Sequence, residues 1–114
     1  MTSDHLRSVF AMYLNQWGQT YLPKRQDTAN LDPLDKPKVL SHAMWMCEQG
    51  LEFLKEEPRN PASSHILEAR LEDEAKQRAK VEKAMRWLGF VQGVLFFSGV
   101  YTIDEMRAHS TSQS

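Results

Sequence analysis

The sequence predicts an all-α fold of about four helices. Apolar residues recur every three or four positions along most of its 114 residues, as they do on the buried face of a helix. Residue types that begin or end helices stand at the edges of these stretches, and no stretch alternates β-branched with polar residues as a half-buried strand does. We expect helices at residues 4–22, 36–57, 65–98 and 103–109.

The first helix, 4–22, carries a single apolar stripe. Ser3 is a suitable N-cap, and Pro23 ends the pattern. The following residues, 23–36, contain two prolines and three aspartates and predict a long loop that is either functional or mobile. The stripe consists of Leu6, Phe10, Tyr13, Leu14, Trp17 and Tyr21.

The second helix, 36–57, has a wider apolar surface. Asp35 can cap its first amides, and Pro37 suits its first turn. Two apolar stripes predict that this helix lies between two neighbours. One stripe contains Leu40, Met44, Cys47, Leu51 and Leu54, and the other Val39, Met46 and Phe53.

The third helix, 65–98, changes character along its length. Residues 65–83 are dense in charge, whereas residues 84–97 are apolar on almost every side. The pattern leaves open whether this is one helix or two pieces broken near Lys83. Because so apolar a helix must be enclosed by protein, we expect a helical bundle completed by homo-oligomerisation.

The residues that flank positions 103–109 predict the fourth helix. Gly99 suits the end of the preceding helix, and Thr102 with Glu105 forms a capping box. Residues 1–109 are therefore expected to form a single domain and residues 110–114 a disordered tail.

Composition narrows the class of protein. A formal charge of -1 disfavours a nucleic-acid coat, and one cysteine fits a reducing compartment. The N-terminal residues lack an apolar signal core, and the longest apolar run, 87–100, is shorter than the roughly 20 residues that span a membrane. We therefore expect a cytoplasmic protein without membrane contact.

Residues for catalysis or metal binding do not form a recognisable pattern. The four histidines share no i,i+3 or i,i+4 spacing, and Cys47 has no cysteine partner. Cys47 lies on an apolar stripe, where a buried hydrophobic role is ordinary, and Glu48 and Glu52 are typical of a solvated helix face. We expect a non-enzymatic protein that needs no metal and no cofactor.

Two glycines interrupt the apolar part of the third helix. Gly89 and Gly93 lie on the same side of the helix, although each glycine costs a helix about 0.8–1 kcal/mol relative to alanine. We expect close helix packing against their bare backbone, by an adjacent helix or a second copy, with a ligand wall as the alternative.

Polar and aromatic residues beside these glycines form the candidate ligand site. A cation, an amide and an aromatic ring are suited to an anionic planar ligand, and the second helix could supply an opposite wall. Alternatively, Glu82 pairs with Arg86 and the aromatic rings belong to the core. The candidates are Lys83, Arg86, Trp87 and Gln92 on the third helix, with Trp45 and His42 on the second.

The last turn and helix also fit a small DNA-binding helix-turn-helix. Residues 102–109 would be the recognition helix, but they offer only Arg107 and His109 as donors beside Asp104 and Glu105. Because acidic residues are as frequent as these donors in the segment, its charge disfavours nucleic acid as a partner.

Two segments resemble a family of small helical accessory proteins of tailed bacteriophages. These segments are residues 40–46 and 82–109, about a third of the chain. The shared motifs are His-x-x-Trp-Met at 42–46, Lys-Ala-x-Arg-Trp-Leu-Gly-Phe-x-Gln-Gly at 83–93 and Tyr-Thr-Ile-Asp-Glu at 101–105. The charged stretch 58–79 is longer than the connector expected in that family. The resemblance implies a phage protein acting in the host bacterial cytoplasm, and it assigns no activity or site.

These observations support two classes of function. The first is a counter-defence protein that sequesters a nucleotide-type immune signalling molecule in pockets of a homo-oligomer. The second is a phage protein that inhibits a host defence or replication protein by direct binding, through the acidic faces at Glu48, Glu52, Glu56 and Glu57 and the charged segment 65–83.

Overall fold

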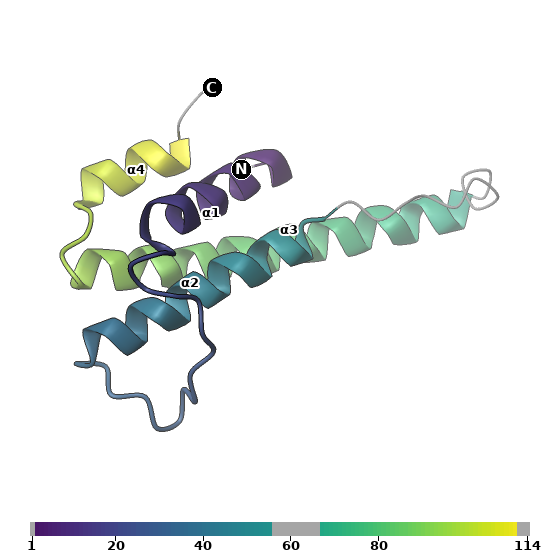
Figure 1. Cartoon of the computed structure of the whole chain (residues 1–114). Coiled ribbons are helices and arrows are strands. Elements are labelled where there is room, and N and C mark those ends of the chain that lie inside the picture. Colours follow the sequence, from purple (N-terminus) through teal and green to yellow (C-terminus); the bar gives the residue numbers. More distant parts are fainter. Residues whose placement is uncertain (1, 56–66, 112–114) are drawn as a thin grey trace.

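The computed structural model describes residues 2–55 and 67–111 as four α-helices (Figure 1). They are α1 (Ser3–Trp17), α2 (Lys36–Phe53), α3 (Leu67–Phe97) and α4 (Ile103–Thr111). These residues contain no strand, so the predicted all-α class is confirmed. α3 is one continuous helix that joins the charged and the apolar segments. α2 ends at Phe53 with Leu54 as its C-cap, four residues before the expected end at 57, which is therefore wrong. The helix start expected at 65 falls outside the described residues.

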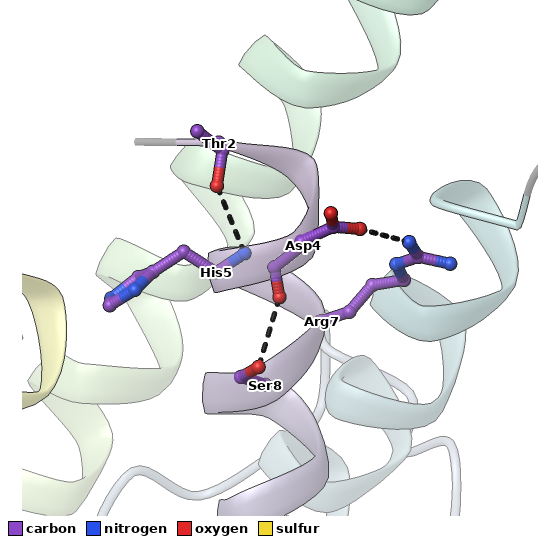
Figure 2. Close-up of polar contacts among 5 residues, drawn as sticks. All are labelled: Thr2, Asp4, His5, Arg7 and Ser8. Carbon is purple, nitrogen blue, oxygen red and sulfur yellow. Dashed lines mark hydrogen bonds and ion pairs between the residues drawn. The ribbon is translucent and has the colours of Figure 1, made fainter. Parts of the chain in front are cut away.

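Side-chain caps begin the first two helices. The backbone amide of His5 donates to Oγ1 of Thr2 at 3.1 Å, so Thr2 caps α1 and the expected Ser3 is its first residue. An ion pair between Arg7 and Asp4 follows in the same turn (Figure 2). Asp35 caps α2 as predicted, and Pro37 lies in the first turn.

The connection from α3 to α4 follows the predicted signals. Gly99 has a φ of 77°, a backbone conformation that glycine adopts without the usual steric cost. The amide of Glu105 donates to Oγ1 of Thr102 at 3.1 Å, and the amide of Thr102 donates to Oε1 of Glu105 at 3.2 Å. The capping box is therefore confirmed, while the helix continues to Thr111, beyond the expected end at 109.

α1 ends at Trp17, five residues before the predicted end. Gly18 follows, and the amides of Thr20 and Tyr21 both donate to the carbonyl oxygen of Trp17, at 3.1 and 2.9 Å. Glycine weakens a helix by about 1 kcal/mol relative to alanine, and here the chain leaves the helix in a tight turn. Tyr21 still packs against the core from outside the helix.

The core lies where α1, α2 and α3 meet, and α4 packs on α1. Gly50 permits the closest approach, because a Cβ atom there would lie 2.5 Å from Cε2 of the buried Phe10. In the described part of the chain, no helix is long and apolar enough to cross a membrane. The buried apolar residues are Leu6, Val9, Phe10, Tyr13, Leu40, Ala43, Met44, Met46, Cys47, Leu54, Ala84, Leu88, Val91 and Leu95.

Candidate functional site

A cavity of about 510 Å³ lies between the loop after α1, the middle of α2 and one residue of α3. Its volume falls within the range of about 300–1,000 Å³ that is usual for small-molecule sites. Aromatic and polar groups share its wall. The lining residues are Arg25, Gln26, Asp27, Thr28, His42, Trp45, Met46 and Trp87.

Two backbone hydrogen bonds hold the loop against α2. The amide of Lys24 donates to the carbonyl oxygen of Ser41 at 3.1 Å, and the amide of Gln26 donates to Nδ1 of His42 at 3.1 Å. Arg25 lies between these two anchors. The loop therefore presents its guanidinium from a fixed stretch of backbone.

Aromatic rings form the opposite wall. The ring centroids of His42 and Trp45 are 5.3 Å apart, and those of Trp45 and Trp87 are 5.9 Å apart. Phe53 supports Trp87 from behind in an edge-to-face contact at 4.7 Å. α2 and α3 thus contribute one continuous aromatic surface.

Arg25 is the basic side chain that enters the lining. Its guanidinium carbon lies 5.7 Å from the Trp45 ring centroid, and the residue is exposed. Asp27 also lines the cavity, but its two carboxylate oxygens accept hydrogen bonds from the Ala29 amide and the Asn30 side chain, at 3.1 and 2.6 Å. These hydrogen bonds hold the carboxylate in its own turn, where it keeps its negative charge, and the Arg25 guanidinium supplies a positive charge to the lining.

His42 is the buried polar residue of this wall, with 6% of its surface exposed. Burial, with the charge of Arg25 as a smaller cause, lowers the pKa of His42 below its usual value. Because Nδ1 accepts a hydrogen bond from Gln26, the neutral ring carries its proton on Nε2. The site therefore combines a hydrogen-bond donor of an uncharged ring with a permanent guanidinium charge.

Three of the six predicted ligand residues meet at the cavity: His42, Trp45 and Trp87. Lys83 does not line the cavity, and its Nζ lies 4.0 Å from the Phe53 ring centroid and 5.5 Å from that of Trp87. Arg86 is exposed and does not line the cavity.

Gln92, the sixth predicted residue, belongs to a polar cluster between α1, α3 and α4. Its Nε2 donates to the Tyr13 hydroxyl and to Oγ of Ser110, both at 3.0 Å. The Tyr13 hydroxyl lies 2.9 Å from Nδ1 of His109. Burial is the main cause that raises the pKa of Tyr13 to about 12 and lowers the pKa of His109.

This cluster attaches α4 to the rest of the molecule. His5 points away from Asp4 and Arg7 (Figure 2), and its Nε2 donates to the carbonyl oxygen of His109 at 2.7 Å. The ring of His109 also contacts Tyr101 edge to face at 4.8 Å. His109, one of the two donors in the helix-turn-helix interpretation, is therefore engaged inside the molecule.

Gly89 and Gly93 face open space within one copy of the chain. A Cβ atom built on either glycine meets nothing within 4 Å. No adjacent helix of the described chain packs closely against them, and packing by a second copy stays a prediction.

Sequence reasoning missed the contribution of the loop to the cavity. Its signals were present in the length of segment 23–36, which favours a functional loop, and in Arg25 directly after Lys24. Nothing in the spacing, however, shows that this loop folds back onto His42.

Cys47 is fully buried, and burial raises the pKa of its thiol to about 12, so the nucleophilic thiolate is disfavoured. Among the described residues, no group of three or more His, Cys, Asp or Glu side chains is placed to hold a metal ion. The chemistry that the cavity offers is stacking, charge pairing and hydrogen bonding.

Comparisons with family models, with curated proteins and with solved structures find no match for this chain.

Proposed function

We propose that this chain is a non-enzymatic binding protein that captures a nucleotide-type ligand in the cavity between residues 25–28, α2 and Trp87. The observation that carries the proposal is the meeting of Arg25 with the aromatic wall of His42, Trp45 and Trp87 around about 510 Å³. An anion and a planar ring on one small molecule would satisfy both halves of this site.

Each group in the cavity has a role in this binding. The indole rings offer flat apolar surfaces for a base, a contact worth about 1–3 kcal/mol per stacked base. The Arg25 guanidinium pairs with phosphate, and Nε2 of His42 donates to a polar atom of the ligand. Stacking and ion pairing need no nucleophile, so the proposed protein binds its ligand without changing it.

The biological role that we propose for this capture is counter-defence. The resemblance of segments 42–46, 83–93 and 101–105 to phage accessory proteins favours a phage protein in the host bacterial cytoplasm. Capture of an immune signalling nucleotide there would counter the host defence. Self-association into a homo-oligomer belongs to the same proposal, although each cavity is lined by residues of one copy.

The proposal is tested by measuring thermal unfolding with a panel of cyclic nucleotides and ADP-ribose derivatives at about 100 μM. A ligand present at 100 times its Kd stabilises the folded state by about 2.7 kcal/mol. We expect at least one member to raise the unfolding temperature. Its Kd is then measured by calorimetry.

Arg25→Gln is the first variant to compare. Removing a charge-assisted hydrogen bond costs about 1.5–3 kcal/mol, so the Kd should rise at least about 10-fold. Arg107→Gln makes the same change at an exposed residue on α4 and should leave the Kd unchanged. Equal effects of the two variants, or no stabilisation by any panel member, would refute capture at this cavity.

One observation favours the second candidate, inhibition of a host protein by direct binding. Residues 71–79 of α3 are all exposed and dense in charge. A pull-down from host lysate distinguishes the candidates, because a stoichiometric protein partner supports direct inhibition and a co-purifying compound that absorbs near 260 nm supports nucleotide capture.

A further inference from the structure

The C-terminal half of α3 leaves an apolar face uncovered on the side away from the core. Phe97 is 89% exposed and Phe90 is 50% exposed, and Gly89 and Gly93 leave the backbone beside them bare. Large side chains thus stand next to empty positions on one helix surface. We call this surface the outer face of α3 and define it by Met85, Arg86, Gly89, Phe90, Gly93, Phe96 and Phe97.

We propose that two copies of this chain associate through the outer face of α3, with the two α3 helices antiparallel about a twofold axis between Gly89 and Gly93. This deepens the self-association within the proposed function, and it does not depend on ligand capture. The cavity lies on the α2 side of α3, so each copy keeps its cavity.

Shape complementarity is the first argument. In a twofold interface, each contact occurs twice with the partners exchanged. An antiparallel crossing at this point places Gly89 opposite the partner's Gly93 and Met85 opposite the partner's Phe97. The bare backbone then lets the helices approach closely, and a thioether meets an aromatic ring, which is a favourable pair.

The available area is the second argument. If a fully exposed phenylalanine or methionine offers about 200 Å², the exposed fractions of Met85, Phe90, Phe96 and Phe97 supply roughly 900 Å² over two copies. Apolar atoms make up about 60% of a typical interface, so roughly 1,500 Å² would be buried in total. Stable interfaces bury about 1,200–2,000 Å².

The distribution of charge favours an antiparallel over a parallel arrangement of the two α3 helices. The last turn of α3 contains no basic residue, and the first turn of α4 contains Asp104 and Glu105. An antiparallel pair brings the exposed Arg86 to this end of the partner's α3, where the helix dipole favours a cation. A parallel pair would instead bring the two Arg86 side chains together.

The test is sedimentation of the full chain over about 1–100 μM, with apolar-to-charged variants at two equally exposed residues. We expect the wild-type chain to reach twice its 13.2 kDa mass. Phe97→Glu should raise the dimer Kd at least about 10-fold, since a charge replaces an apolar contact. Leu34→Glu, at a loop leucine that is also 89% exposed, should leave the Kd unchanged.

Two further variants examine the geometry. Gly89→Leu fills the bare position, and Arg86→Glu reverses the charge, so both should weaken the dimer while circular dichroism shows an unchanged helix content. A 13.2 kDa species at every concentration, or a dimer that Phe97→Glu and Gly89→Leu both leave intact, overturns the proposal. Nucleotide binding by the Phe97→Glu monomer would show that capture survives without self-association.

Discussion

Two helical glycines, Gly50 and Gly89, have opposite surroundings. Gly50 faces the ring of the buried Phe10, where a Cβ atom would lie 2.5 Å from Cε2. Gly89 faces open space in one copy of the chain. Substitution by alanine therefore has opposite consequences at the two positions.

We predict that Gly50→Ala destabilises the folded chain by about 1–3 kcal/mol, because the packed Phe10 ring must move. Gly89→Ala should instead stabilise it by up to about 1 kcal/mol through higher helix propensity. Urea denaturation followed by circular dichroism, at a concentration where the chain is monomeric, measures both changes. Similar losses for the two variants would contradict the packing described for α1 and α2.

At the scale of the helices, α4 is the element whose attachment depends on polar contacts. None of its residues is classed as buried, and His109 joins it to Tyr13 and, through its carbonyl oxygen, to His5. A hydrogen-bonded cluster that contains a neutral histidine makes this attachment sensitive to pH.

We predict that the chain loses stability as the pH falls from about 7.5 to 5.5. The pKa values of His109 and His42 are lowered in the folded state, mainly by burial, so protonation favours the unfolded chain. Their stabilising contribution is complete above the unfolded pKa of about 6.5 and declines below it. Glu105 acts in the opposite direction on His109 but is the smaller cause.

Unfolding temperatures of the wild-type chain and of His109→Gln, measured across this range, check the prediction. The variant should show a shallower dependence on pH, because it lacks one of the two histidines whose pKa is lowered in the folded state. A rise in wild-type stability on acidification to pH 5.5 would contradict the neutral state of these rings.

The sequence predicted the helices well and some of their ends poorly. The caps at Asp35, Gly99 and Thr102 are local interactions, and local interactions can be read from residue types. The end of α1 at Trp17 was missed because apolar spacing continues to Tyr21, which packs on the core without being helical.

For the whole molecule, the sequence predicted three of the eight residues that line the cavity. His42, Trp45 and Trp87 follow from aromatic residues at helical spacing, and these three do come together. Arg25 was missed because its position depends on where a loop folds back, which a tertiary contact with His42 decides. Gln92 lies away from these residues for a similar reason, since α4 brings Ser110 to it.

We propose that the cavity lined by Arg25, Trp45 and Trp87 binds a nucleotide-type ligand, and NMR tests this most directly. The three tryptophans of the chain give three indole N–H signals in an NMR spectrum, and Trp17 serves as an internal control because its Nε1 donates to the Tyr101 hydroxyl outside the cavity lining. Titration with ADP-ribose and cyclic dinucleotides should shift the signals of Trp45 and Trp87 while that of Trp17 stays in place. Three unmoved signals throughout these titrations, or a Trp17 shift as large as the other two, would contradict the claim.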